Sequence, residues 1–185
     1  MVRNIVFDIG NVLADFRLKE FLAEKGFDAK MSKRILKASL MTPYWGQFER
    51  AEITEKEAID LFASVDPDIR EELWRAFADV SGLLVIRDYS VQLIKDLKDQ
   101  GYNVFYLSNY SKKAYDECGE SLAFMEYMDG GLVSFKSGKT KPDPAMYLQF
   151  LTEYGLKAEE SLFIDDTEEN VEVARTLGFK GIVFT

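Results

Sequence analysis

The stretch Ile5-Val6-Phe7-Asp8-Ile9-Gly10-Asn11-Val12-Leu13 decides the fold. Its first three residues are apolar without alternation, which indicates a strand that is buried on both faces, as in a parallel sheet. The strand then ends at a carboxylate, and Leu162-Phe163-Ile164-Asp165-Asp166-Thr167 repeats this pattern near the other end of the chain. Ligands of open α/β sheets bind outside the carboxyl ends of the strands. We therefore expect carboxylates that are far apart in the sequence to meet at one site.

Three of these carboxylates, Asp8, Asp165 and Asp166, are expected to form a metal site. Carboxylates at close range repel one another unless a cation or a proton lies between them. Mg²⁺ is the expected cofactor, because it takes oxygen ligands and keeps several water molecules. Neighbouring side chains of a strand point in opposite directions, so Asp166 is the expected direct ligand and Asp165 is expected to orient the site.

Composition excludes several classes of function. The formal charge of −9 argues against non-specific binding to nucleic acid or to an acidic membrane, which needs a positive field. The chain has no His, which excludes Ser-His-Asp triads and His-based zinc sites, and the single Cys118 excludes an internal disulfide. Carboxylate, hydroxyl, lysine or metal chemistry remains.

The N-terminus shows no signal peptide, because Met1-Val2-Arg3 leads directly into the first strand. No apolar run is long enough to span a membrane. We expect a cytoplasmic protein that is a monomer or a weak homodimer. The acidic charge still allows a small phosphorylated partner, because a metal and one lysine can reverse its sign locally.

Residues 15–81 differ in pattern from the rest of the chain. Apolar residues recur there at helical spacing, and Thr54 with Glu57 gives a capping-box signal, so we expect a four-helix insertion. Strands and helices alternate from Gly82 onward, with a helix expected from Lys112 to about Met128 and a short strand over 132–135. This alternation favours right-handed βαβ crossovers. The predicted fold class is α/β, a Rossmann-like parallel sheet with helices on both faces. Residues 1–14 and 82–185 would form the core and residues 15–81 an α-helical cap.

Three further residues suit phosphoryl chemistry. Asp8 can act as a nucleophile and form an aspartyl-phosphate, although a strand-end Asp can also simply cap a turn. Ser108 ends a strand, and Asn109 leads toward a helix N-terminus, where phosphate oxygens bind well; an N-cap role for serine is the alternative. Lys141 is restrained by Pro142 and can pair with both the phosphate and the nucleophile.

The order Asp, Ser, Lys-Pro, Asp-Asp resembles the haloacid dehalogenase-like superfamily of phosphohydrolases over the whole chain, in its branch with a small α-helical cap. The resemblance implies that Asp8 is nucleophile and metal ligand and that Ser108 and Asn109 contact phosphate. It implies Lys141 as the group that neutralises charge and Asp166 as a metal ligand.

Gly10 departs from that pattern, because most phosphatases of the family have there a second Asp that serves as general acid and base. Its backbone carbonyl can still bind Mg²⁺, but the proton donor is missing. Such an enzyme would favour a leaving oxygen that is already acidic, as in a sugar 1-phosphate. The first motif also looks like that of the bacterial α-D-glucose-1-phosphate phosphatase branch, which shares this glycine.

The cap or the segment after the first strand can supply the missing proton, and Asp15 and Glu49 are the candidates. Trp45 and Glu49 are also candidate substrate-binding residues, within an aromatic cluster that includes Tyr44, Phe48 and Arg50. Such a cluster can equally be the core of a small helical cap.

Two other functions remain open from the sequence. One is a metal-independent haloacid dehalogenase that uses Asp8 to displace halide from carbon; that branch usually carries an aromatic residue where Gly10 stands. The other is a catalytically impaired, ligand-binding relative that lost turnover together with the second Asp.

Overall fold

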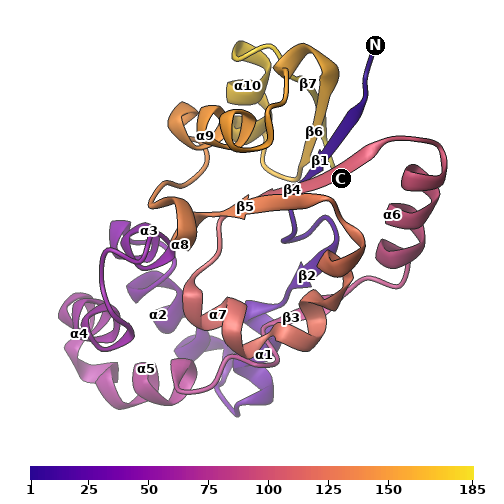
Figure 1. The fold of residues 1–185 in the computed structure, drawn as a ribbon. Coiled ribbons are helices and arrows are strands. Elements are labelled where there is room, and N and C mark those ends of the chain that lie inside the picture. The colour runs from indigo at the N-terminus through magenta and orange to yellow at the C-terminus, as the bar shows by residue number, and fades with distance from the viewer.

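Strand β1 (Asn4–Phe7) lies at the centre of a five-stranded parallel sheet in the computed structural model, which describes all residues 1–185. The strand order is β5-β4-β1-β6-β7, and a separate group of helices lies at one end of the sheet (Figure 1). The α/β class with a Rossmann-like parallel sheet is thereby confirmed. None of the helices is long and apolar enough to cross a lipid bilayer.

The remaining strands are β2 (Ala14–Phe16), β3 (Leu84–Ile86), β4 (Asn103–Ser108), β5 (Gly130–Val133), β6 (Ser161–Asp165) and β7 (Lys180–Val183). The helices around the sheet are α6 (Ser90–Asp99), α7 (Lys112–Glu117), α8 (Ser134–Ser137), α9 (Pro144–Tyr154) and α10 (Glu168–Thr176), with the 3₁₀ helices η2 (Gly119–Tyr127) and η3 (Ala158–Glu160). The inserted helices are α1 (Leu18–Glu24), α2 (Ala29–Ala38), α3 (Pro43–Glu49), α4 (Glu55–Val65), η1 (Pro67–Ile69) and α5 (Arg70–Phe77).

Helices cover both faces of the sheet, because successive side chains of each strand point to opposite sides. Ile5 and Phe7 belong to a core that includes Ile94 of α6, whereas Val6 belongs to a second core with Phe150 of α9. Helices α9 and α10 therefore lie on one face and α6 on the other (Figure 1). Burial on both faces accounts for the unbroken apolar run of β1.

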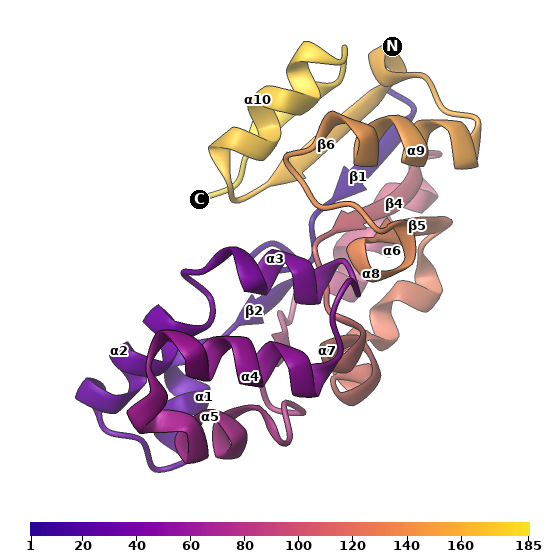
Figure 2. The same ribbon diagram turned by 90° about the vertical axis from the view of Figure 1, so that its left-hand side faces the viewer.

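The parallel register brings the ends of three strands together. Phe7 pairs with Tyr106 of β4 on one side and with Ile164 of β6 on the other. Asp8, Leu107 and Asp165 therefore follow at the same height at the carboxyl edge of the sheet. The inserted helices lie beyond this edge, so the carboxyl ends of the strands point toward them (Figures 1 and 2).

The insertion contains five α-helices, one more than the four expected from the sequence. The additional helix is α3, which contains Gly46 and no fully buried residue, so it lacks the apolar stripe by which helices are recognised. The capping box of α4 is present, with Thr54 and Glu57 bonded to each other's backbone N–H groups.

The structure differs from expectation at three more places. Strands β2 and β3 form a short antiparallel ribbon, too short for its pattern to be visible in the sequence. The helix expected from Lys112 to about Met128 is divided into α7 and η2. The strand expected over 132–135 ends at Val133, and Ser134 begins the one-turn helix α8.

Candidate active site

A buried lysine links two of the strand-end carboxylates. Lys141 precedes α9, and its Nζ lies 2.8 Å from Oδ1 of Asp8 and 2.6 Å from Oδ2 of Asp165. The Asp8 side chain is 12% exposed, whereas those of Lys141 and Asp165 are 1% and 0% exposed. Of the three, only Asp8 thus offers surface to a ligand.

The pKa values of Lys141 and Asp8 depend on the charges around them. Burial alone would lower the pKa of Lys141, but the charges of Asp8 and Asp165 outweigh it, and its pKa lies above the ordinary value. Burial raises the pKa of Asp8, and Asp165 acts in the same direction. Lys141 and a hydrogen bond from Ser108 oppose that rise. A second positive charge beside Asp8 would favour its ionised form further.

Asp165 is held from several sides. Asn170 Nδ2 donates to both of its oxygens, at 3.0 and 3.1 Å, and the backbone N–H of Thr167 donates to Oδ1 over 2.8 Å. With Lys141 on Oδ2, this carboxylate has little capacity left for a metal. These contacts suit the orienting role expected for Asp165.

Asp166 points toward the first loop of the chain. Its Oδ2 accepts a hydrogen bond of 2.9 Å from Asn11 Nδ2, which joins the loops after β1 and β6. Asn11 has a φ of 56°, a left-handed conformation that asparagine tolerates better than most residues. This loop geometry therefore places Asn11 beside Asp166.

The carboxylates fit a divalent cation. Asp8, Asp165 and Asp166 each offer an oxygen within 4.8 Å of the others, and Gly10 lies in the wall of the same cavity. An all-oxygen donor set next to one lysine suits Mg²⁺. Asp8, Asp166 and the backbone carbonyl of Gly10 are the groups that would hold the ion.

Ser108 and Asn109 have different surroundings. Ser108 is buried at the end of β4 and its hydroxyl lies against Asp8. Asn109 binds the backbone of Lys141 twice, accepting from its N–H at 2.8 Å and donating to its carbonyl at 3.0 Å. The side-chain amide of Asn109 therefore positions Lys141. Its second N–H has no partner in the protein and Asn109 lines the cavity, so the phosphate contact expected for it stays a prediction.

A cavity of about 230 Å³ joins these residues to the inserted helices. Asp8, Gly10, Ser108, Lys141 and Asp166 line its polar end. Trp45 and Glu49 of α3 line it from the opposite side. The two candidates from the insertion and the strand-end residues thus line one cavity.

Helix α3 is bonded to the sheet domain at its C-terminal end. Ser134 Oγ donates to the backbone carbonyl of Glu49 over 2.8 Å, and Arg50 Nη1 donates to Thr140 Oγ1 over 3.3 Å. Thr140 directly precedes Lys141. Glu49 is therefore held close to the segment that carries the catalytic lysine candidate. Helix α3 lies beside α8 (Figure 2).

The surroundings of Glu49 raise its pKa toward neutral pH. Burial raises the pKa of Glu49 to about 7, and the charge of Asp8 acts in the same direction. A hydrogen bond of 3.0 Å from Trp45 Nε1 and the charges of Lys141 and Arg50 act against this rise. A carboxyl group with such a pKa can donate and accept a proton near neutral pH.

The other proton-donor candidate lies elsewhere. Asp15 pairs with Arg87 at 2.7 Å and does not line the cavity, and neither does Tyr44 or Arg50. Phe48 lines it, while Trp45 both lines it and stacks on Phe62 with ring centroids 6.2 Å apart. Trp45 is therefore at once part of the packing among the inserted helices and part of the cavity wall.

Tyr110 lines the cavity and was not found by sequence reasoning. Its side chain is buried, its hydroxyl has no hydrogen-bond partner in the protein, and burial raises its pKa. The hydroxyl therefore remains a protonated donor. No sequence signal marks it, because Tyr110 stands in a loop between a strand and a helix.

Comparisons with known proteins find a matching family and related sequences. A family model described as haloacid dehalogenase-like hydrolase matches residues 2–178. A sesquiterpene phosphatase of Aspergillus oryzae is 27% identical, covering 97% of this chain and 88% of the relative. A D-ribitol-5-phosphate phosphatase of Bacteroides thetaiotaomicron is 24% identical, covering 97% and 90%.

A solved structure has the same fold. The HAD family enzyme BT-2542 of Bacteroides thetaiotaomicron, in complex with magnesium and inorganic phosphate, superimposes with a TM-score of 0.76 at 22% identity. The match covers 100% of this chain and 95% of that one. The sheet and the inserted helices therefore follow one common arrangement.

Proposed function

This chain belongs to the haloacid dehalogenase-like hydrolases, and from that premise we propose a Mg²⁺-dependent phosphatase that hydrolyses a small phosphorylated metabolite through an aspartyl-phosphate on Asp8. Its phosphatase relatives make it a phosphohydrolase. The observation that carries the proposal is the joint placement of Asp8, Lys141 and Asp166 at the polar end of one cavity.

In the first step, Asp8 attacks the phosphorus atom, and the bond between phosphorus and the alcohol oxygen breaks. Lys141 neutralises charge on the phosphoryl oxygens, and Ser108 offers its hydroxyl beside them. When bound, Mg²⁺ supplies further positive charge at the phosphoryl group. Asp165 and Asn109 keep Lys141 in place through the contacts described above.

Glu49 serves as proton donor and acceptor. It gives its proton to the departing alcohol oxygen, and the resulting carboxylate then takes a proton from the water that attacks the aspartyl-phosphate. Orthophosphate leaves, and both Asp8 and protonated Glu49 are restored. General acid–base help of this kind typically contributes about 10²–10⁴-fold to the rate.

A sugar 1-phosphate substrate, which Gly10 suggests, remains a prediction. It assumed that no proton donor is present and that the leaving oxygen must therefore be acidic, and Glu49 weakens this assumption. With a proton donor in the cavity, the leaving oxygen need not be acidic, so esters of ordinary alcohols become possible substrates. The two relatives named above differ in the polarity of the substrates in their names, and so they leave the substrate class open.

Other expectations remain proposals. We keep the division into a core of residues 1–14 and 82–185 and a cap of residues 15–81, because the β2–β3 ribbon lies at both junctions. The cytoplasmic location, the monomeric or weakly dimeric state and the lack of nucleic-acid and membrane partners stay predictions.

A screen for phosphate release tests the proposal. Wild-type protein and Asp8→Asn protein are mixed with p-nitrophenyl phosphate, sugar phosphates, nucleotides and acyl phosphates, with and without Mg²⁺. We expect turnover by the wild type only, and only with Mg²⁺. Undiminished turnover by Asp8→Asn would exclude the proposed nucleophile, and tight phosphate binding without turnover would favour the impaired relative.

A further inference from the structure

The part of the cavity wall that the inserted helices supply is largely apolar. It comes from these helices and from the segments that follow them, and it includes Leu40, Trp45, Phe48, Ile59, Phe62 and Phe77. Val80, Leu83 and Leu84 continue this surface toward the sheet domain. A ligand whose phosphate lies at Lys141 would place its organic part against these side chains.

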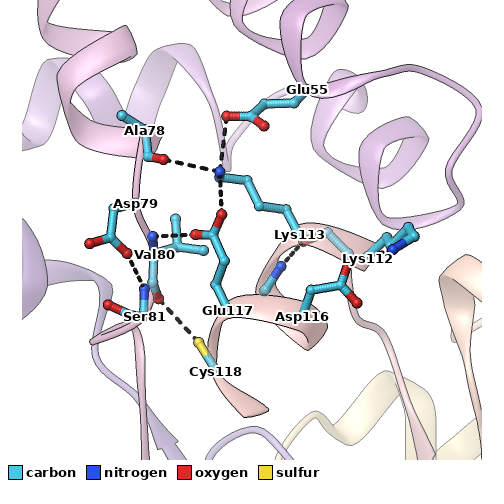
Figure 3. Close-up of polar contacts among 12 residues, drawn as sticks. Glu55, Ala78, Asp79, Val80, Ser81, Lys112, Lys113, Asp116, Glu117 and Cys118 are labelled. Carbon is cyan, nitrogen blue, oxygen red and sulfur yellow. Dashed lines mark hydrogen bonds and ion pairs between the residues drawn. The ribbon is translucent and has the colours of Figure 1, made fainter.

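The cavity wall contains one lysine besides Lys141, and this lysine has no free donor. Lys113 Nζ lies 3.0 Å from Glu55 Oε1 and donates to Glu117 Oε1 over 2.6 Å and to the carbonyl of Ala78 over 3.1 Å (Figure 3). An ammonium group has three N–H donors, and three acceptors take them up. Lys113 therefore joins α7 to the inserted helices and is not available to a ligand hydroxyl.

The other polar side chains of the wall are engaged in a similar way. Asn11 donates to Asp166 and accepts from the backbone of Phe16, and the amide of Asn109 is used by Lys141. Ser111 Oγ accepts from the N–H of Ala114 as the N-cap of α7. Beyond the phosphate end, free capacity remains at the Tyr110 hydroxyl, at the second oxygens of Glu49 and Glu55, and at the O–H of Ser111.

This inventory of hydrogen bonds disfavours a polyhydroxylated substrate. Each hydroxyl that loses water without gaining a partner costs free energy, and the apolar side chains that make up most of this wall offer no partner. An apolar body loses nothing of this kind and gains from burial. Glu49 removes the need for an acidic leaving oxygen, so an ordinary alkyl alcohol can depart.

We infer that the substrate is the monophosphate ester of a largely apolar alcohol. Its hydrocarbon part fills the chamber, by which we mean the apolar part of the cavity between the sheet domain and the inserted helices. The inference rests on the proposed phosphatase function for its chemistry, but not for its binding. Tyr110 would donate to the single polar group that such an alcohol can carry near the ester.

Two series of ligands test the inference separately from turnover. Calorimetry measures the affinity of wild-type protein with Mg²⁺ for butyl-, hexyl- and octylphosphonate, which cannot be hydrolysed at their C–P bond. Phosphate release from butyl, hexyl and octyl phosphate is compared with that from glucose 1-phosphate and ribitol 5-phosphate. Full burial is worth about 0.8 kcal/mol per CH₂, which corresponds to about fourfold in affinity.

We expect affinity and kcat/KM to rise severalfold with each added pair of CH₂ groups and to exceed the values for the two polyol phosphates. Affinities that do not change with chain length, or a preference for the polyol phosphates, would overturn the inference. If phosphonate affinity rises with chain length but no phosphate ester is hydrolysed, the proposed apolar binding site stands and the proposed phosphatase function is wrong.

A matched pair of variants tests whether the alkyl chain binds in the chamber. Leu40 is 36% exposed and lines the cavity, whereas its neighbour Met41 is 75% exposed and does not. Leu40→Gln is expected to weaken octylphosphonate binding severalfold while the affinity for orthophosphate stays the same, and Met41→Gln should change neither. Equal effects of both variants on octylphosphonate would overturn the placement.

Discussion

The indole N–H of Trp45 donates a hydrogen bond of 3.0 Å to the carboxyl group of Glu49, one turn further along α3. This bond holds the carboxyl group in the cavity wall, opposite the strand-end carboxylates. The chain thus carries a titratable group on the inserted helices, while Gly10 leaves the usual position without one. In the proposed mechanism, the nucleophile and the proton donor thus come from two parts of the fold.

Glu49→Gln is expected to lower kcat for an alkyl phosphate by about 10²-fold or more, since an amide cannot donate the proton that the alcohol needs. The rate of the first step should fall much less for p-nitrophenyl phosphate, because its leaving group needs no proton. Single-turnover release of p-nitrophenol measures this rate. Glu20→Gln, an exposed change on α1, is the control. Equal losses for both esters in single turnover would contradict the role as acid.

The pH dependence of kcat for alkyl phosphates should reflect the titration of Glu49. The pKa of Glu49 is raised to about 7, so the acid is protonated below that pH and lost above it. We expect the rate to fall as pH rises through about 7, and we expect Glu49→Gln to remove this limb. A limb that persists in the variant would assign it to another group.

Gly10→Asp should rescue the Glu49→Gln variant. A Cβ at position 10 would meet no heavy atom within 4 Å, and the residue lines the cavity beside Asp8. The new carboxyl group can then donate the proton from the first loop, and we expect at least about tenfold of kcat for an alkyl phosphate to return. Absence of rescue in a variant with unchanged thermal stability would mean that proton donation is not what Glu49 contributes.

Lys141→Met should destabilise the fold as well as abolish turnover. The lysine pairs with two carboxylates, and the loss of one partner from a buried ion pair typically costs about 3–5 kcal/mol. Urea unfolding in EDTA measures this, with Lys139→Met as control, because Lys139 binds the neutral Gln149. A cost of the same size for both variants would contradict the central place of Lys141.

Chelation by EDTA should stop phosphate release, and added Mg²⁺ should restore it, because Asp8 and Asp166 need a cation between them to hold a phosphate nearby. Asp166→Asn should raise the Mg²⁺ concentration needed for half-maximal rate. Activity that survives chelation, measured as halide release from 2-haloacids, would favour the dehalogenase.

The strand-end residues of the site could be predicted because a general rule places them. Asp8, Ser108 and Asp165 each end a buried apolar run, and parallel strands bring such ends to one edge of a sheet. The five-stranded sheet follows from the same runs. Local patterns also give the capping box of α4, which requires no knowledge of distant contacts.

The remaining features depend on packing between distant segments. The sequence makes Asn109 a candidate phosphate ligand, and only the approach of the Lys141 backbone shows that its amide also positions that lysine. Helix α3 lacks an apolar stripe, yet its contacts to Ser134 and Thr140 determine where Glu49 lies. Tyr110 is visible as a free donor only after every neighbouring polar group has been counted.

Detection of a phosphoenzyme tests the central claim most directly. Wild-type protein with Mg²⁺ is mixed with a hydrolysed substrate, quenched in acid within the first turnover, digested and examined by mass spectrometry. We predict a phosphoryl group on the peptide that contains Asp8, discharged by hydroxylamine and absent from Asp8→Asn. Turnover with no phosphorylated Asp8, or with the phosphoryl group on another residue, would contradict the account.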